Sequence, residues 1–299
     1  MKRTILALAA AAAVLCTLLP NASAQVFVVN SASNTIGAYD LSGATISSSL
    51  VTGLNIAEGL ATDGSSLFVT NNGASTIGKY TFDGLPVNSA LVSGLISPTE
   101  IVVSGDRIFV MGSDTNDYGI VSEYTTDGTL VNASLITGLD GTSGIAVNGN
   151  NIFISSSNTG SISLYSLAGD LLNPSLISGL HVPTAMAISG SDLYVANVGD
   201  GTIGKYTTSG ATVNAKLIES LNHPFDIEIL GTDLFVSNYG SGTIGEYTTS
   251  GATVNDKLVD NLNNPFGLVV VPEPSTWLLL AMGLGGLLLL PLRNRTAPR

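Results

Sequence analysis

The chain has little cysteine, histidine and positive charge. Its one cysteine, Cys16, lies in an apolar run near the N-terminus, so disulfide bonds cannot stabilise the chain that follows. Between Val26 and Val271 there are 5 basic residues against 21 acidic ones, which gives a net charge near −16. A surface this acidic repels nucleic acid and anionic lipid, so we expect no nucleic-acid partner.

Catalytic signatures are also missing. The sequence holds no nucleophile elbow, no HExxH metalloprotease motif and no Rossmann glycine pattern. The only histidines, His181 and His223, stand one or two residues before a proline, where we expect loops. No stretch of the domain shows helical apolar periodicity over about ten residues, so a helical fold is excluded.

One unit of about 41 residues fills the chain instead. Each unit holds four short runs rich in Val, Ile, Phe, Tyr or Thr, separated by Gly, Asn, Asp, Ser or Pro. The six units begin at Val26, Leu67, Ile108, Ile152, Leu193 and Leu234. A period of about 40 to 50 residues built from short strands is typical of a β-propeller with one sheet, or blade, per unit. The sequence therefore predicts an all-β, six-bladed propeller over residues 25–271.

The phase of the repeat predicts how the ring closes. The chain enters at the second strand of a unit, at Val26, and leaves on the first strand of another, at 266–271. Six complete blades exist only if this last strand joins the N-terminal blade. We therefore expect 267–271 to pair with 26–30, so that no sheet edge stays open.

The third run of each unit carries a tyrosine at a fixed place. The six are Tyr39, Tyr80, Tyr124, Tyr165, Tyr206 and Tyr247. A ring of aromatic side chains for carbohydrate stacking is one interpretation. We favour packing of each tyrosine between adjacent blades.

The N-terminus predicts export. Lys2 and Arg3 precede an apolar run, and Ala22-Ser23-Ala24 forms an A-x-A cleavage site. This arrangement is typical of a secretory signal peptide, here residues 1–24, removed by signal peptidase. Leu15 is not the small residue that lipidation of Cys16 needs.

The C-terminus carries a second targeting pattern over residues 272–299. Pro272, Glu273 and Pro274 are followed by an apolar run at 277–292 and by Arg293, Arg295 and Arg299. The run makes a helix of about 24 Å, short but workable for a hydrocarbon core of about 30 Å, and the arginines would hold the C-terminus in the cytoplasm. We therefore predict one transmembrane helix at 277–292.

This tail resembles the PEP-CTERM sorting signal of Gram-negative bacteria that have an exosortase. Such tails are also called ice-binding protein C-terminal domains, a name that implies nothing about ice in this chain. The resemblance implies an inner-membrane precursor that exosortase cuts near the Pro-Glu-Pro segment. The product is then attached to the cell surface or released, often in cells that make exopolysaccharide. An uncleaved tail anchor is the alternative.

The first two runs of the repeat, as in EGLATDGSSLFVTN at 58–71, resemble NHL-type and SMP-30-like six-bladed propellers. SMP-30-like lactonases hold a divalent ion with Glu, Asn and Asp side chains at one end of the channel. The candidates that this resemblance suggests in this chain are Glu58, Glu100, Asn197, Asp226 and Glu228. Oxygen ligands of this kind suit Ca²⁺, the one cofactor that we consider. A full lactonase ligand set does not align, so the match implies a shape and not an activity.

Glu228 is unusual within the repeat. The other units carry Ala or Val at this position, namely Ala61, Val102, Ala146, Ala187 and Val269. Its carboxyl should therefore be at least partly buried. A buried carboxylate must be paired, protonated or bound to a metal.

Two classes of function fit these observations. The first is a non-enzymatic binding or scaffold protein of the cell surface or extracellular matrix, with a polysaccharide or a protein as its ligand. The alternative is an enzyme, either a Ca²⁺-dependent gluconolactonase-like hydrolase or a propeller similar to the streptogramin lyases. We favour the first, because no catalytic constellation accompanies the sorting tail.

Overall fold

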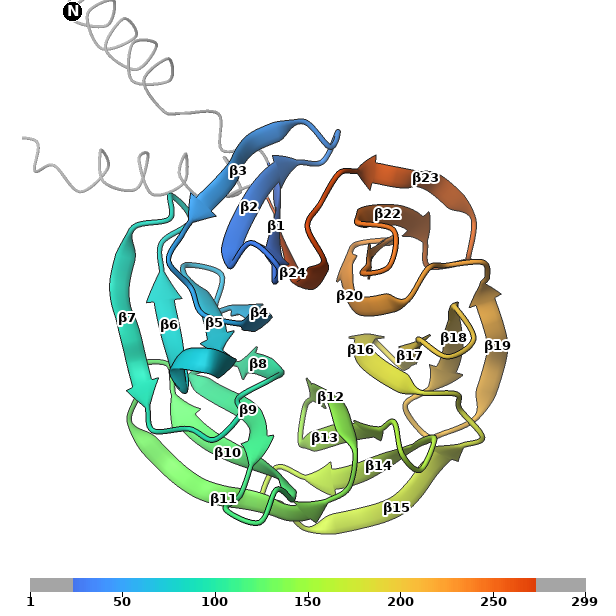
Figure 1. Cartoon of the computed structure of the whole chain (residues 1–299). Helices are drawn as coiled ribbons and strands as arrows, with labels where there is room; N and C mark the ends of the chain where they lie inside the picture. The colour runs from blue at the N-terminus through green and yellow to red at the C-terminus, as the bar shows by residue number, and fades with distance from the viewer. Residues whose placement is uncertain (1–23, 273–299) are drawn as a thin grey trace, which may run out of the picture. The chain divides into compact units, whose positions relative to one another are not determined.

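The computed structural model describes residues 24–272, of which Gln25–Val271 form one compact unit. Six four-stranded antiparallel sheets stand around a central channel (Figure 1), which confirms the predicted propeller. The predicted signal peptide and sorting tail, with Glu273, Pro274, the three arginines and the helix at 277–292, fall outside the described residues and stay predictions. From residue 24 to residue 272 no helix is long and apolar enough to cross a membrane.

The first three blades, each from its innermost strand outward, are as follows. Blade one is β24 (Pro265–Val271), β1 (Gln25–Asn30), β2 (Thr35–Asp40) and β3 (Thr45–Val51). Blade two is β4 (Ala57–Thr62), β5 (Leu67–Asn71), β6 (Thr76–Tyr80) and β7 (Pro86–Ser93), with a 3-10 turn, η1 (Asn72–Ala74), between β5 and β6. Blade three is β8 (Ile101–Ser104), β9 (Arg107–Ser113), β10 (Gly119–Thr125) and β11 (Leu130–Leu139).

The other three blades follow the same order. Blade four is β12 (Thr142–Asn148), β13 (Asn151–Ser156), β14 (Ser161–Ser166) and β15 (Leu171–Ser178). Blade five is β16 (Pro183–Ser189), β17 (Asp192–Asn197), β18 (Thr202–Thr207) and β19 (Thr212–Ile218). Blade six is β20 (Pro224–Leu230), β21 (Asp233–Asn238), β22 (Thr243–Thr248) and β23 (Thr253–Val259).

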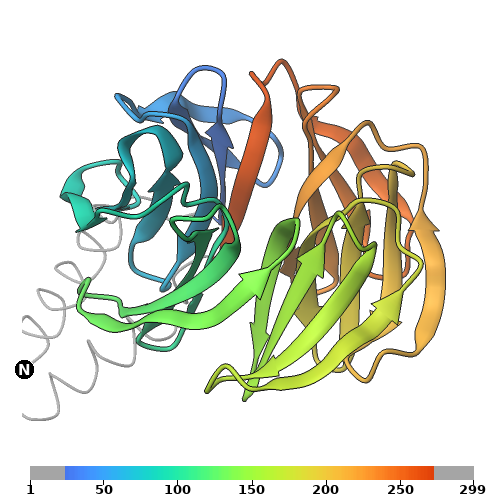
Figure 2. The same cartoon turned by 60° about the horizontal axis from the view of Figure 1, so that its bottom comes forward.

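The ring closes through the last strand, as the phase of the repeat predicts. Strand β24 pairs antiparallel with β1, from Gln25 opposite Val271 to Asn30 opposite Pro265. Figure 2 shows this red strand beside the blue strands of the first blade. Two segments more than 200 residues apart therefore make one blade, and the edge of β1 is covered by β24.

The second strand of each blade is apolar without alternation because both of its faces are covered. In β1, Phe27 and Val29 pack toward blade two, whereas Val26 and Val28 pack toward blade six. The same arrangement recurs around the ring, so the core consists of six clusters that each join two neighbouring blades. Burial between blades, and not within one sheet, therefore stabilises the ring.

The recurrent tyrosines pack between blades, as predicted. Five of the six are buried and Tyr165 is half-buried, and all six belong to or line the inter-blade clusters. In four blades a glycine precedes the tyrosine by two residues and lies under its ring. At Gly204, for example, a Cβ atom would stand 2.7 Å from Cε2 of Tyr206. The T-I-G-x-Y pattern thus places the aromatic ring of the tyrosine over a glycine, which has no side chain to collide with it.

Candidate binding site at the channel mouth

The antiparallel blades give the ring two distinct ends. At the mouth end lie the loops that join second to third strands and those that lead from each outer strand to the next blade. At the turn end lie the tight turns that join first to second and third to fourth strands. Each inner strand runs from the mouth end into the channel, so its first residues form the rim of the mouth (Figure 1).

Five of the six inner strands have an irregularity at the rim, and just before the regular strand β8 the equivalent residue is Thr99. In β20 the pairing passes from Pro224 opposite Asn238 to Asp226 opposite Ser237, so Phe225 is an extra, bulged residue. Shifts at the same place occur in β4, β12, β16 and β24. Such bulges re-aim a side chain and are common at the rims of barrels and beside functional sites. The residues at this place are Glu58, Thr99, Ser143, Thr184, Phe225 and Phe266, which we call the rim residues.

Hydroxyl groups in the second strands hold the rim in place. Thr70 Oγ1 donates to the carbonyl oxygen of the rim residue Thr99 in the next blade. Ser155 Oγ donates in the same way to Thr184 at 2.6 Å, and Ser237 Oγ to Phe266 at 2.8 Å. Ser237 Oγ also accepts from the N–H of Asp226 at 2.9 Å. The rim backbone is therefore fixed from two blades at once.

The rim is chemically uneven. Blades six and one present Phe225 and Phe266, whose ring centroids lie 3.8 Å apart, and Tyr239 from the adjacent loop lies 6.0 Å and 6.2 Å from them. Blade two carries Glu58, blades three and four carry the half-buried Thr99 and Ser143, and blade five carries Thr184, which is buried. All three aromatic rings are half-buried. A ligand at this mouth meets rings on one side and hydroxyls on the other.

A cavity of about 140 Å³ lies below the rim among the inner strands. Most of its lining residues are apolar and they come from all six blades, and three of them carry carboxyl groups: Glu100, Asp226 and Glu228. Glu100 comes from blade three and the other two from blade six, on the opposite side of the channel (Figure 1). The structure thus brings together three of the five predicted ligand residues.

Glu100 is the most confined of these groups. It is 8% exposed, and its Oε1 atom has no hydrogen-bond partner among residues 24–272. Burial raises the pKa of Glu100 well above its usual range, and the charges of Asp226 and Glu58 raise it further. A buried carboxyl oxygen without a partner costs free energy, which a hydrogen-bond donor from a ligand in the adjacent cavity would reduce.

Asp226 and Glu228 point into the same channel because they are two residues apart on one strand. Burial raises the pKa of Asp226 to about 7, although the N–H groups of Leu268 and Ile227 donate to its two oxygens and lower it. Burial also raises the pKa of Glu228 to about 8, and the charge of Asp226 adds to this. Glu228 stands opposite Phe235, where the other blades carry Ala or Val. This confirms the predicted partial burial of its side chain.

Glu58 sits higher, at the rim. Burial raises the pKa of Glu58 to about 7, while Asn72 Nδ2, 3.1 Å from Oε1, lowers it. Near neutral pH the channel therefore contains carboxyls in both protonation states. Such groups can donate or accept hydrogen bonds, or exchange a proton with a ligand.

Asn197 lies apart from this cluster. It ends β17, is buried, and does not line the cavity; its Oδ1 atom has no partner among the described residues. Across residues 24–272 no group of three or more His, Cys, Asp or Glu side chains lies close enough to hold a metal ion. Because both oxygens of Asp226 already accept backbone N–H groups, the residues do not fit a calcium site well. The calcium assignment stays a prediction.

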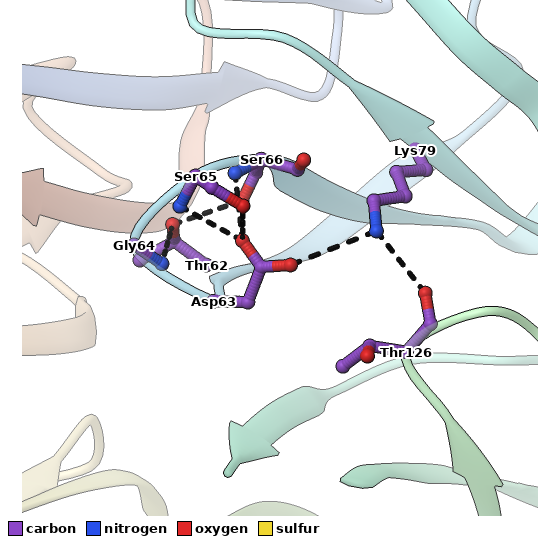
Figure 3. A network of polar contacts seen from close by, with 7 residues as sticks. All are labelled: Thr62, Asp63, Gly64, Ser65, Ser66, Lys79 and Thr126. Carbon is purple, nitrogen blue, oxygen red and sulfur yellow. Dashed lines mark hydrogen bonds and ion pairs between the residues drawn. The ribbon is translucent and has the colours of Figure 1, made fainter. Parts of the chain in front are cut away.

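The positive charges of the described chain lie elsewhere. Lys79 Nζ lies 3.6 Å from Asp63 Oδ2 at a tight turn and donates to the carbonyl oxygen of Thr126 in the next blade at 3.1 Å (Figure 3). Lys205 and Arg107 make ion pairs at the turn end of blades five and three. The last two, Lys216 and Lys257, lie on the outermost strands β19 and β23. None of the five belongs to an inner strand or a mouth loop.

The two histidines lie in exposed mouth loops, as predicted. His181 Nδ1 lies 2.8 Å from Asp200 Oδ1, and His223 Nδ1 lies 2.9 Å from Asn222 Oδ1. Neither lines the cavity. The aromatic cluster beside His223 was not predicted, because Phe225 and Phe266 look like ordinary strand residues until the bulge is known.

Comparison with known proteins supports the fold. No protein-family model matches the chain, and no curated protein matches it. Among solved structures, a chain of a nidogen/laminin complex superposes with a TM-score of 0.71 at 16% identity, over 84% of this chain and 99% of that one. A gluconolactonase from Xanthomonas campestris gives 0.54 at 14% identity, over 73% and 84% of the two chains. Virginiamycin B lyase from Staphylococcus aureus gives 0.54 at 19% identity, over 83% and 89%.

These neighbours support the six-bladed propeller fold of the chain. Their identities are too low to carry over an activity. One neighbour belongs to a protein–protein complex and two are enzymes, so the same architecture serves both classes of function.

Proposed function

We propose that this chain is an exported, exosortase-processed propeller that acts as a binding or scaffold module at the cell surface or in the extracellular matrix. Its ligand enters at the channel mouth. The observation that carries this proposal is the uneven rim above an unpartnered, buried carboxyl. Six equivalent positions, three of them held by a hydroxyl group of the preceding blade, carry rings, hydroxyls and a carboxyl around one opening, which suits selective binding.

Export and processing rest on the sequence of the two ends. Mass spectrometry of the protein recovered from its host tests them. We expect a mature chain that begins at Gln25 and lacks the residues beyond the Pro-Glu-Pro segment. An intact chain that still carries both ends inside the cell would overturn this part of the proposal.

Binding at the mouth is tested with exopolysaccharide isolated from the host. Co-sedimentation of the propeller, residues 25–271, should be reduced by Phe225→Ala and by Glu58→Gln at the rim. Asp106→Asn, an exposed acid at a tight turn of the opposite end, serves as the matched control and should bind like the native chain. If all four proteins sediment alike, or none does, the mouth is not a polysaccharide site and a protein ligand must be sought there.

An enzymatic function is the alternative, favoured by one specific observation. Carboxyls with pKa values of about 7 and 8 in a confined cavity are suited to general acid–base chemistry near neutral pH. The resemblance in fold to a gluconolactonase and to virginiamycin B lyase suggests a lactone as the first substrate to test. Turnover of a sugar lactone or a streptogramin B that Glu100→Gln abolishes would favour the enzyme, as would a higher melting temperature with Ca²⁺ than with EDTA.

A further inference from the structure

The acidic channel has no counter-charge of its own. Three carboxyls line the cavity and a fourth, Glu58, stands at the rim, yet none of the inner strands or mouth loops carries a lysine or an arginine. The inner strands β12, β16 and β24 bring no titratable side chain to the channel, and the mouth-loop histidines, His181 and His223, lie outside the cavity. Among the described residues no basic side chain therefore offsets the charge of these four carboxyls. A ligand with positive charge would supply what the fold leaves out.

The channel carboxyls differ from an ordinary patch of surface acids because Glu100 is buried. Glu100 lines the cavity, and its Oε1 atom is buried without a hydrogen-bond donor in the described part of the chain. Burying such an atom costs free energy unless a partner is present. A donor that enters from the mouth would remove that cost.

The aromatic cluster indicates which kind of cation would bind at the channel mouth. Phe225 and Phe266 contact each other, and Tyr239 is fixed by a hydrogen bond from Asn264 Nδ2 to its hydroxyl at 2.9 Å. Asp226 directly follows Phe225 in the chain. Rings next to carboxyls attract a cation through their π faces while they exclude water from its apolar parts.

A bare metal ion gains nothing from these rings. An organic ammonium gains from both sides, because its N–H or N–CH₃ groups meet the carboxyls and its carbon body lies on the rings. The hydroxyls of Thr99 and Ser143 across the rim suit polar substituents on that body.

We propose that the channel mouth binds an organic ammonium group carried on a ring or short alkyl body, with Glu100 and Asp226 toward the charge and Phe225 and Phe266 against the carbon frame. This inference rests on the proposed binding function and names the chemical class of its ligand. Because the rim is built by the propeller alone, residues 25–271 are sufficient to test it.

The probe is benzylammonium, and benzyl alcohol is its neutral counterpart of similar size. Isothermal titration of the propeller at about pH 8, above the pKa of about 7 of Glu58 and Asp226, should give at least about tenfold tighter binding of the ammonium than of the alcohol. At about pH 5 all four carboxyls carry protons and this preference should disappear. Equal affinity for the two probes at both pH values would overturn the proposal.

Variants separate the two parts of the site. Glu100→Gln should weaken the ammonium and leave the alcohol unchanged, whereas Phe225→Leu should weaken both probes. Asp106→Asn at the turn end is the control and should change neither, and thermal melting of each variant shows that it is folded. Ammonium binding that survives Glu100→Gln, or displacement of the ammonium by equimolar calcium, would assign the carboxyls another role and overturn the proposal.

The two proposals fail in different ways. If rim variants lose exopolysaccharide binding but the native chain ignores benzylammonium, the binding function stands and the ligand class is wrong. If benzylammonium binds as described but no surface ligand does, the mouth is a small-molecule site and the scaffold role is wrong.

Discussion

Replacing Glu228 by Gln should stabilise the propeller above neutral pH. The side chain keeps its shape and loses only its ability to ionise. In the unfolded chain the carboxyl has its ordinary pKa of 4.5, and in the channel the pKa is about 8. The native residue therefore binds its proton more tightly when the chain is folded.

The sign of the effect follows from this difference. Below about pH 4 the group is protonated in both states and has no influence on the pH dependence. Between pH 4.5 and about 8 the unfolded chain releases the proton while the folded chain keeps it, so the free energy of unfolding falls as pH rises. Above about pH 8 the carboxyl is ionised in both states, and the free energy of unfolding falls no further through this group. Glu228→Gln abolishes this contribution.

The magnitude has an upper limit of about 5 kcal/mol, since each pH unit of that window contributes about 1.4 kcal/mol. Water reaches the half-buried carboxyl through the channel, so we expect about 2 to 3 kcal/mol. For a domain of this size that corresponds to a rise in melting temperature of about 5 to 10 °C at pH 9. At pH 4 the two proteins should melt within about 1 °C of each other.

Thermal melting followed by circular dichroism across this pH range measures the effect. Tryptophan fluorescence cannot follow this unfolding, because the one tryptophan, Trp277, lies outside residues 25–271. Glu219→Gln is the matched control, since Glu219 is exposed on a loop at the perimeter and should show no pH-dependent difference. If Glu228→Gln follows the native curve at every pH, the carboxyl ionises freely in the folded chain, and the description of the channel as a desolvated site is wrong.

Three further changes test the ring itself. Ser237→Ala removes the hydroxyl that donates to Phe266 and should cost about 1 to 3 kcal/mol in urea unfolding, with native-like stability as the contrary result. Gly204→Ala places a Cβ against the ring of Tyr206 and should lower stability by about 1 to 3 kcal/mol, measured by thermal melting; an unchanged melting temperature would show that the ring moves aside freely. Deleting Pro265–Val271 leaves an open edge on β1, so size-exclusion chromatography should show aggregation, and a stable monomer would contradict closure by β24.

The fold could be predicted because its pattern occurs six times. Repetition at 41 residues identifies the unit, and the phase at Val26 and 266–271 determines the closure. The uninterrupted apolar character of segments such as VFVVN has a plain cause, since Phe27 and Val28 face different neighbouring blades. A prediction that averages over six copies is resistant to local exceptions.

The site is harder to predict for the same reason. The functional residues are those that differ between the repeats. A residue that occurs in one repeat only is not confirmed by the equivalent positions of the other five. Glu228 stood out because its equivalents are Ala or Val, and its burial follows. Phe225 did not, because its place one residue before Asp226 falls on a bulge, which shifts the register that alternation would assign.

Asn197 illustrates the opposite error. Its side chain has the right chemistry for a metal ligand, and its repeat position is close in sequence to the first strand. Yet the second strand is covered on both faces, so a side chain at its end is buried away from the cavity. The counterparts Asn30 and Asn71 accept from backbone N–H groups of the loops that enter the inner strand of their own blade, at 3.4 Å each, and not from the loop that follows them.

The distribution of charge connects stability with binding. Three acids at the turn end, Asp63, Glu123 and Asp192, pair with Lys79, Arg107 and Lys205. The carboxyls that line the channel have no basic partner among the described residues, and their raised pKa values lower the stability as pH rises. A fold under selection for stability alone would carry small apolar residues there, as most of the equivalent positions do. Carboxyls kept at a stability cost, beside rings fixed by the next blade, are the pattern expected of a site whose partner arrives from outside.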